Sequence, residues 1–416
     1  MMSEWKEYRV DDVCLKVISG GTPNTRKSEY YGGLIPWVRT QEINFNRLYD
    51  TEIKISDEGL KNSSAKWIPE NSIIIAMYGA TAGKVAISKI PVTTNQACCN
   101  LIINHEKFDY RFIYYNILSR FEKIADMAIG GAQQNLNGAM IKNLPISIPD
   151  LPTQIAIAEI LSSLDDKIEL NNNINKELEK LAQTLFKQWF IDFEFPNENG
   201  EPYQSSGGEM VESELGMIPK NWEVRKLSAL IRLTGGGTPK RSNAEYWDGK
   251  IKWFSIQDIP NDSQVFVVDT KEKITELGLN KSSTKLLPRG TTIITARGTV
   301  GKLALVAEPM AMNQSCYGVN GASGLGEFYT YFNLKNAVEK LRQNVHGAVF
   351  DTITSNTFDT IKSIYGNNDL ANLFEEIVRP MMEQIENHCR ENQELSNLRD
   401  TLLPKLISGE LNVKDL

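Results

Sequence analysis

The chain has 416 residues, of which 41% are hydrophobic and 23% charged, a composition typical of a globular protein with two or three domains. No uncharged apolar run approaches the ~20 residues that a membrane-spanning helix needs, and the first residues lack the pattern of a secretory signal. Five cysteines without a CxxC pair fit a reducing compartment. We therefore expect a cytoplasmic protein that does not contact a membrane.

The charge is distributed unevenly along the chain. The formal net charge of −7 by itself argues weakly against nucleic-acid binding. However, residues 1–150 carry 17 basic and 16 acidic groups, and residues 222–367 carry 18 and 13. Residues 151–200, 201–221 and 368–416 have net charges of −5, −3 and −5. The first two segments are thus permissive for DNA contact, and we expect the acidic ones to face solvent or a partner protein.

A long internal repeat organises the sequence. Gly-Gly-Thr-Pro at residues 20–23 recurs at residues 236–239, and Asn-Gln at residues 95–96 recurs at residues 313–314. A period this long cannot be a solenoid, whose units have roughly 20–50 residues. The repeat indicates two domains of one fold in a single chain.

We predict a mixed α/β fold for each domain, residues 1–150 and residues 222–367. Short apolar runs such as Ile73–Ile75 are bounded by Gly, Asn and Pro, as strands are. The stretch from Phe108 to Met127 predicts a helix packed on a sheet, and Glu327 to Val345 predicts its counterpart.

Each domain precedes a predicted spacer helix. Residues 151–195 form the first, with Asp150 as its N-cap candidate. Residues 368–416 form the second, in which Pro380 predicts a kink or a late start and Pro404 predicts a stop. Apolar residues spaced three and four apart form a seam on each helix: Ile157, Leu161, Leu164, Ile168, Leu178, Leu181 and Leu185, then Phe374, Ile377, Met381, Ile385, Leu395, Leu398 and Leu402.

Because either seam would be exposed on a lone helix, we expect the two helices to pack against each other. A local two-fold axis between the domains would make this pairing antiparallel, with the domains at opposite ends of a spacer of roughly 50 Å. Asparagines at residues 171–173 interrupt the first seam, where they cost stability but can fix the register of a partner helix. Residues 196–221 predict a polar linker. The predicted fold class is α+β: two similar α/β domains separated by two long antiparallel, coiled-coil-like helices, with pseudo-two-fold symmetry.

Motifs for catalysis are weak. Residues 79–84 resemble a phosphate loop, but only three residues separate the glycines and Val85 replaces the Ser or Thr that would hold Mg²⁺. Asp150 and residues 165–167 match the spacing of a nuclease motif, but the second acid and the lysine would not share a helix face. No methyltransferase motif occurs, and the three histidines lack metal-ligand spacing. The sequence favours recognition over catalysis, with no catalytic residue and no metal site.

Polar residues on expected loops are the candidates for DNA contact. Arginine can fork onto guanine or phosphate, Asn and Gln amides can pair with adenine, and a lysine beside a glycine turn can approach a phosphodiester. For any single residue, a solvated loop position is the alternative interpretation. The candidates are Thr22, Arg26, Lys27, Arg39, Tyr78, Lys84, Gln133, Gln134 and Asn135 in the first domain, and Thr238, Lys240, Arg241, Arg297, Lys302 and His346 in the second.

Residues that recur between the repeats are interpreted differently from residues that change. Because Asn95-Gln96 returns as Asn313-Gln314, we interpret this pair as scaffold that structures a turn. In contrast, Gln-Gln-Asn at residues 133–135 corresponds to Val-Phe-Asp at residues 349–351. Such a difference is expected of residues that read two different targets.

Several segments resemble the specificity subunit of Type I restriction–modification systems. The sharpest are residues 154–171 and residues 185–193, to which residues 203–210 and residues 398–410 add. The resemblance covers nearly the whole length and follows the order domain, helix, domain, helix.

The resemblance implies two target-recognition domains, each reading one half of a bipartite, asymmetric sequence in double-stranded DNA. The paired helices would set the spacing and dock two modification (methyltransferase) subunits, and restriction subunits would add ATP-driven translocation and cleavage. S-adenosylmethionine, ATP and Mg²⁺ are then expected on the partner subunits, with no cofactor in this chain. Two alternatives stay open: a stand-alone DNA methyltransferase or nuclease, and a protein-only scaffold that binds two copies of a protein.

Overall fold

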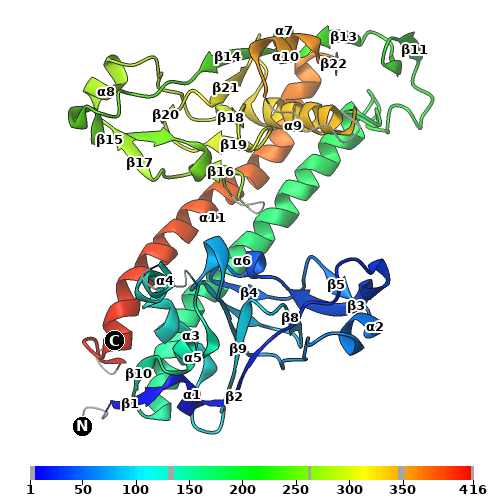
Figure 1. The fold of residues 1–416 in the computed structure, drawn as a ribbon. Coiled ribbons are helices and arrows are strands. Elements are labelled where there is room, and N and C mark those ends of the chain that lie inside the picture. Colours follow the sequence, from blue (N-terminus) through cyan, green and yellow to red (C-terminus); the bar gives the residue numbers. More distant parts are fainter. Residues whose placement is uncertain (1–4, 130–134, 261–263, 345–351, 414–416) are drawn as a thin grey trace. The chain divides into compact units, whose positions relative to one another are not determined.

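The computed structural model describes residues 5–129, 135–260, 264–344 and 352–413 (Figure 1). The chain divides into two units, here called unit 1 (Met1–Asp166 with Ser396–Leu416) and unit 2 (Lys167–Leu395). Each unit combines one repeat of the sequence with a stretch of both long helices, and each is described by itself.

Unit 1 is a mixed α/β domain. Its elements are β1 (Lys6–Arg9), α1 (Val10–Val13), β2 (Cys14–Ser19), β3 (Tyr31–Val38), β4 (Asn46–Leu48), β5 (Lys54–Ile55), α2 (Asp57–Lys61), β6 (Ile73–Ala76), β7 (Val85–Ser88), β8 (Thr93–Thr94), β9 (Cys98–Ile103), α3 (Tyr110–Leu118), α4 (Phe121–Ile129), α5 (Gly138–Lys142) and β10 (Pro145–Ile148). The strands form sheets in the orders β2-β9-β6-β7-β4, β5-β3-β8 and β1-β10.

The central strand β6 explains why its sequence is an unbroken apolar run. It lies between β7 and β9, with Ile73 opposite both Ile87 and Leu101. Ile73 and Ile75 face the core that contains α3, whereas Ile74 faces a second core on the other side of the sheet. Because successive strand residues point to opposite faces and both faces are buried, every position must be apolar. The strand prediction is confirmed here.

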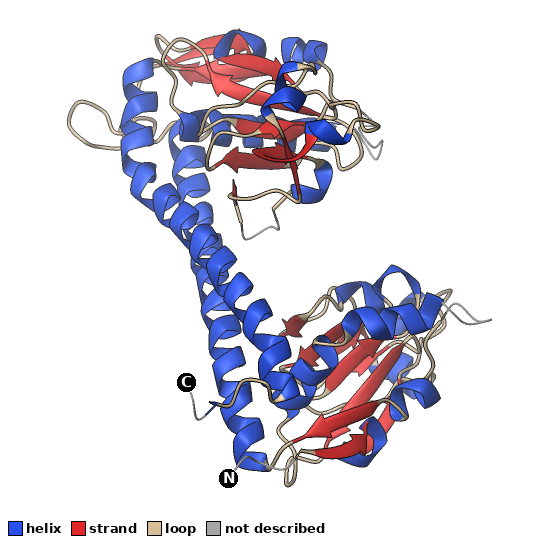
Figure 2. Cartoon of the chain, turned by 90° about the vertical axis from the view of Figure 1, so that its left-hand side faces the viewer, coloured by secondary structure: helices blue, strands red, loops and turns tan. Residues whose placement is uncertain are grey.

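Unit 2 repeats this design (Figure 2). Its elements are β11 (Met210–Ser213), β12 (Gly216–Pro219), β13 (Glu223–Lys226), α7 (Leu227–Leu230), β14 (Ile231–Gly235), β15 (Trp247–Phe254), β16 (Phe266–Val267), β17 (Glu272–Ile274), α8 (Glu276–Asn280), β18 (Thr292–Thr295), β19 (Leu303–Val306), β20 (Ala311–Met312), β21 (Cys316–Gly321), α9 (Glu327–Asn344), α10 (Ser355–Thr360) and β22 (Lys362–Tyr365). Its sheets run β14-β21-β18-β19-β16, β17-β15-β20, β13-β22 and β11-β12. Apart from the added β11-β12 hairpin, this is the strand order of unit 1, so the predicted doubled α/β architecture is confirmed.

The predicted helix from Phe108 to Met127 is divided in unit 1, whereas its counterpart α9 is continuous. The division between α3 and α4 falls at Ser119 and Arg120. The Ser119 hydroxyl donates to the carbonyl of Asn116 at 2.9 Å, and Arg120 Nε donates to the same oxygen at 3.2 Å. These side-chain bonds compete with the backbone pattern of a continuous helix.

Two long helices, α6 (Leu151–Phe190) and α11 (Asn368–Ser408), contribute to both units. Helix α6 begins as predicted, because the Asp150 carboxylate accepts the Thr153 N–H at 3.0 Å. Two predictions for α11 are wrong: the helix does not start late at Pro380 and does not stop at Pro404, since it runs through both prolines. Both prolines are exposed on the helix surface, where water can satisfy the carbonyl that each leaves unpaired.

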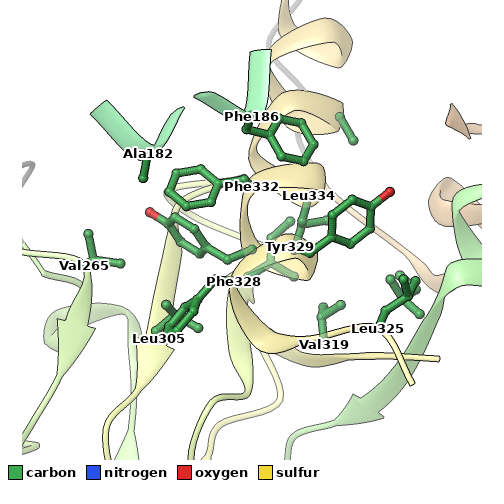
Figure 3. Packing of buried hydrophobic residues seen from close by; sticks show 14 of the residues in the cluster. Ala182, Phe186, Val265, Leu305, Val319, Leu325, Phe328, Tyr329, Phe332 and Leu334 are labelled. Atoms are coloured by element: carbon green, nitrogen blue, oxygen red, sulfur yellow. The ribbon is translucent and has the colours of Figure 1, made fainter. Parts of the chain in front are cut away.

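The two helices pair in antiparallel fashion, as predicted. In unit 2, Phe186 of α6 packs on Phe374 of α11 with ring centroids 5.6 Å apart, and Asn171 bonds to Asn392 at 2.9 Å. Residue numbers therefore rise along one helix as they fall along the other. The apolar end of this pairing also meets α9, where Ala182 and Phe186 lie against aromatic rings including Phe332 (Figure 3).

The buried face of the helix pair departs from the predicted seam. Leu181, Ile377 and Leu398 are 53%, 40% and 47% exposed, instead of lying between the helices. The other predicted seam residues are buried or partly buried. A straight helix with 3.6 residues per turn drifts away from a strict coiled-coil repeat, and this drift moves the contact by one position. The buried face of α11 follows Phe374, Val378, Met382, Ile385 and Cys389.

A polar layer interrupts this apolar contact within unit 2. Asn171, Asn175 and Asn392 are 0%, 1% and 3% exposed. Asn171 donates to Glu391 Oε2 at 2.7 Å and to Asn392 Oδ1 at 2.9 Å, while His388 Nδ1 lies 2.8 Å from Asn175 Oδ1. The opposite helix thus accepts both hydrogen bonds from the Asn171 amide nitrogen, and Asn392 donates to Asn172 Oδ1 at 2.9 Å. Asn171 Oδ1 is buried without a hydrogen-bond partner among the described residues.

Residues 196–221, predicted as a polar linker, are more ordered than that prediction implied. They contain the β11-β12 hairpin. Phe195 stacks on Tyr203 at 4.6 Å and on Trp222 at 5.0 Å between ring centroids. These aromatic contacts hold the connection against the start of the second repeat.

Candidate DNA interface

The recurring Gly-Gly-Thr-Pro loop is held in the same way in both units. The indole N–H of Trp37 donates to the carbonyl of Gly21, and that of Trp253 donates to the carbonyl of Gly237, each at 3.0 Å. A Cβ at Gly236 would lie 1.9 Å from the backbone oxygen of Asn313, so only glycine fits there. The recurring loop is therefore a rigid scaffold element.

Each loop is also tied to the recurring Asn-Gln turn. The Thr22 hydroxyl donates to Gln96 Oε1, and the Thr238 hydroxyl donates to Gln314 Oε1. The Asn95 side chain accepts the N–H of residue 97 at 3.1 Å, which closes the turn. This bonding agrees with the interpretation of the Asn-Gln pair as scaffold, and it occupies the hydroxyls of two DNA-contact candidates.

A second loop cluster lies at the end of the central strand, and its backbone is anchored identically in the two units. In unit 1 the Met77 N–H donates to the residue 97 carbonyl at 2.8 Å, and the Met77 carbonyl accepts the Leu136 N–H at 3.1 Å. In unit 2 Ala296 makes the same two bonds, to the residue 315 carbonyl at 2.8 Å and from the Ile353 N–H at 2.9 Å. The next residues are the candidates Tyr78 and Arg297, both exposed.

Glycine turns follow these two residues. Gly79 and Gly298 have φ values of +75° and +77°, which residues with a side chain rarely adopt. Each turn returns to the central strand through a backbone hydrogen bond of 2.8 Å. The Gly83 N–H donates to the carbonyl of residue 76, and the Gly301 N–H donates to the carbonyl of residue 295. Candidates Lys84 and Lys302 come directly after the turns, and Asn135 is exposed next to the anchor residue of unit 1.

Lys84 is held by two residues that the sequence reasoning missed. Its Nζ donates to Asn44 Oδ1 at 2.7 Å and lies 5.7 Å from the centre of the Phe45 ring. Phe45 has a φ of 56°, a strained conformation for a residue with a side chain, and it packs on Phe121 of α4. No sequence signal marks Asn44 or Phe45, because their role depends on a contact with a turn 40 residues away along the chain.

Lys302 lines a cleft of about 290 Å³ within unit 2, which also contains Lys335, Arg342 and Glu179. Arg342 donates to the carbonyls of Val300 and residue 301, each at 3.1 Å, and so supports the glycine turn. Lys335 is paired with Glu179 at 2.7 Å. The cleft therefore mixes both charges, and Arg342 and Lys335 are engaged by the protein itself.

The two arginines near the scaffold loops are also engaged by the protein itself. Arg39 pairs with Glu42 and Glu52. Arg241 donates to Glu272 at 2.9 Å and stacks over the Trp247 ring at 4.0 Å. The hydrogen bond from Arg241 lowers the pKa of Glu272, which keeps this pair ionised. Either arginine would have to leave a carboxylate to contact DNA.

The remaining candidates are placed as follows. Arg26 and Lys240 are exposed, and Lys27 donates to the Tyr30 hydroxyl at 3.0 Å, a bond that raises the pKa of the lysine. The structure thus gathers Tyr78, Lys84 and Asn135 at one strand end. Thr22 belongs to the scaffold loop, and Arg26 and Lys27 follow that loop in the chain. Gln133, Gln134 and His346 lie outside the described residues.

The described residues contain neither a membrane-spanning helix nor a cluster of metal-binding side chains. In the part of the chain that the structure describes, no helix is long and apolar enough to cross a membrane. Within the same residues, no group of three or more His, Cys, Asp or Glu side chains is arranged to hold a metal ion. In the nuclease-like pattern, Asp150 caps α6 and the second acid lies on that helix, where Asp165 accepts hydrogen bonds from the Tyr115 hydroxyl at 2.5 Å and from Arg399 at 2.7 Å.

Comparison with known proteins identifies the family. A family model described as Type I restriction modification DNA specificity domain matches residues 2–180 and 219–364. The chain is 29% identical to the Type I restriction enzyme MjaIX specificity subunit of Methanocaldococcus jannaschii, over 99% of this chain and 95% of that protein. It is 24% identical to the Type I restriction enzyme HindI specificity subunit of Haemophilus influenzae, over 99% of this chain and all (100%) of that one.

A solved structure has the same fold. The crystal structure of a Type-I restriction-modification system S subunit from M. genitalium matches with a TM-score of 0.57 and 18% sequence identity, covering 97% of this chain and 96% of that one. The family model matches both repeats and most of the chain. On this basis, the protein belongs to the Type I restriction modification DNA specificity family.

Proposed function

We propose that this chain is the specificity subunit of a Type I restriction–modification complex, in which each repeated domain reads one half of a bipartite, asymmetric DNA target. The observation that carries the proposal is the double family match, to residues 2–180 and 219–364, which assigns a DNA specificity domain to each repeat. Two domains of one fold with different exposed residues are suited to reading two different half-sites.

Each domain would combine two kinds of contact. Lysines and arginines such as Lys84 and Arg26 would contact phosphates, which position the domain on the duplex without reading sequence. Side chains at the end of the central strand would reach base edges in the major groove, where each base pair presents a distinct pattern of donors and acceptors. The rigid scaffold loops supply the fixed geometry that such contacts need.

The helices would serve two purposes in the complex. Their pairing would set the distance between the half-sites, and their surface would dock two modification subunits. The helices expose the apolar residues Leu170, Leu181, Leu373 and Ile377 in unit 2 and Leu398 in unit 1, which a docked subunit would cover. The modification subunits would bring S-adenosylmethionine, and restriction subunits would bring ATP and Mg²⁺. We assign no catalytic step to this chain.

The proposal is tested by mapping methylated adenines in DNA from cells that express this chain with its modification subunit. We expect a bipartite motif with an unread spacer. Replacing residues 1–150 by the corresponding domain of a relative should change one half of the motif and leave the other half intact. A contiguous motif, or a change in both halves, would contradict the proposal.

A control addresses the catalytic alternative. The purified chain is incubated with S-adenosylmethionine, Mg²⁺ and DNA in the absence of partner subunits, next to the assembled complex. We expect methyl transfer only in the complex. Turnover by the isolated chain would show that it carries an active site of its own.

A further inference from the structure

Tyr78 and Arg297 occupy the same place in the two units. Each follows a central-strand end whose backbone makes the same two hydrogen bonds, through Met77 in unit 1 and Ala296 in unit 2. Each precedes a glycine with a positive φ, which is +75° at Gly79 and +77° at Gly298. Because the backbone is fixed on both sides, the two side chains leave equivalent scaffolds at equivalent points.

The fold does not require either side chain. Tyr78 is 39% exposed, and Arg297 is also exposed. Neither belongs to a hydrophobic core cluster of the described residues. By contrast, residues that recur between the units, such as Trp37 and Trp253, are buried and hydrogen-bonded to the scaffold. Because the backbones match and neither side chain packs in the core, the difference between Tyr78 and Arg297 indicates that the two side chains contact different groups of a bound partner.

The chemistry of the two side chains differs in one decisive respect. An arginine presents a planar fork of donors that can bond O6 and N7 of guanine together, the commonest specific contact to a base edge in the major groove. A tyrosine presents one hydroxyl at the end of an apolar ring, so it cannot make this two-donor contact. The two units would therefore differ in their response to guanine at the base pair that this position faces.

We propose that Tyr78 and Arg297 are specificity-determining residues at equivalent positions, and that Arg297 selects a guanine in the half-site read by unit 2 while Tyr78 does not select guanine in the other half-site. This inference rests on the proposed function, because it assumes that each unit reads a half-site. It adds the residue and the base class on which the two halves of the target differ.

The test uses the complex of the full chain with its modification subunit and selects bound sequences from a randomised DNA pool. Arg297→Lys keeps the charge but loses the fork, Arg297→Tyr copies the first unit, and Tyr78→Arg copies the second. Arg232→Tyr is the matched control, because Arg232 is an exposed arginine on strand β14 of the same sheet. It lies opposite Asn320 of β21, whereas the strand end that precedes Arg297 lies opposite Cys316, at the other end of β21.

We expect Arg297→Lys and Arg297→Tyr to reduce discrimination for guanine at one base pair of one half-site by roughly tenfold. Tyr78→Arg should create a preference for guanine in the other half-site. Arg232→Tyr should leave the selected sequence unchanged. The circular dichroism spectrum and melting temperature of each variant are measured alongside, because an exposed substitution should alter neither.

Three outcomes overturn the inference. One is an unchanged motif in the Arg297 variants. Another is a uniform loss of affinity with a weaker salt dependence, since that behaviour marks a phosphate contact. The third is a change at Arg297 without any change at Tyr78, which would break the equivalence of the two positions. If the wild-type complex selects no bipartite motif at all, the proposed function itself fails, and this result is distinct from the other three.

Discussion

The two units start corresponding helices by different means. In unit 1, α3 is capped locally: the Asp109 carboxylate accepts the N–H groups of Arg111 at 2.8 Å and Phe112 at 3.3 Å. In unit 2, the cap of α9 comes from another helix, since Glu375 of α11 accepts the N–H groups of Phe328 at 3.0 Å and Tyr329 at 2.9 Å. The requirement for an acceptor at the helix start is shared, because the first N–H groups of any helix have no internal partner. The residue that meets the requirement is free to change.

A second pair of contacts shows the same freedom. The buried Tyr115 hydroxyl donates to Asp165 at 2.5 Å, and the buried Tyr331 hydroxyl donates to Glu179 at 2.9 Å. Burial raises the pKa of both tyrosines, so both remain donors. The tyrosine recurs between the repeats, whereas its acceptor is an aspartate in one unit and a glutamate in the other.

The largest expected effect on stability comes from the glycines of the scaffold loop, which are the same in both units. Gly236→Ala should destabilise unit 2 by about 3 kcal/mol or more, because the new Cβ would lie 1.9 Å from a backbone oxygen. Gly20→Ala should do the same to unit 1, where the nearest oxygen is 2.0 Å away. Urea unfolding followed by tryptophan fluorescence measures both.

The neighbouring Gly235 provides the matched control for this prediction. An added Cβ there meets no atom within 4 Å, and its φ is not positive. Gly235→Ala should therefore be close to neutral. Equal stability of the Gly235 and Gly236 variants would show that the scaffold loop tolerates side chains and that its recurrence has another cause.

The comparison of helix caps predicts unequal costs. Glu375→Ala removes a buried acceptor from two N–H groups and should cost about 2–3 kcal/mol. Asp109→Ala removes an ordinary N-cap and should cost about 1 kcal/mol. Glu375→Gln retains an acceptor oxygen and should recover much of the loss. Equilibrium unfolding of the three variants tests the order, and equal costs for the two alanine variants would contradict the distinction between local and tertiary caps.

The polar layer of unit 2 can be compared with its apolar surroundings in a double-mutant cycle. Asn171→Leu alone should cost about 1–2 kcal/mol, because it removes the donor to Asn392 and Glu391. Asn171→Leu with Asn392→Leu should cost less than the sum of the single changes, since replacing both buried partners can be nearly neutral. A cost equal to or above the sum in thermal unfolding would mean that the two amides do not act as a unit.

The smallest effect is a pH dependence of the same layer. Burial, together with the nearby Lys167, lowers the pKa of His388 below its ordinary 6.5, an effect that Glu391 partly opposes. The folded chain then binds a proton at His388 less readily than the unfolded chain. The stability that His388 contributes is therefore present above pH 6.5 and is lost as the pH falls from there through the lowered pKa. In melting curves between pH 7.5 and pH 5.5 (about the range in which a histidine titrates), His388→Gln should lose less stability than the wild type. An identical decline in both proteins would exclude the effect.

Several features of this protein could be predicted from its amino-acid sequence. The repeat predicted two domains of one fold, the run at Ile73 predicted the central strand, and Asp150 predicted the start of α6. The spacing of apolar residues predicted that the long helices pair. The repeat is visible as two matching stretches far apart in the sequence. The other features depend on short apolar patterns and capping, which involve residues within about one or two helical turns of each other.

Other features depend on contacts between residues that are distant in the chain, so they appear only in the folded structure. The cap of α9 by Glu375 joins residues 47 positions apart, and the Lys84–Asn44 bond joins residues 40 positions apart. Helix α11 continues through its prolines because both lie on its exposed face. Which of its residues are buried depends on how the helix packs against α6. The equivalence of Tyr78 and Arg297 likewise emerges only from matched backbone bonds, because a hydrogen bond requires proximity in space and leaves no local pattern in the sequence.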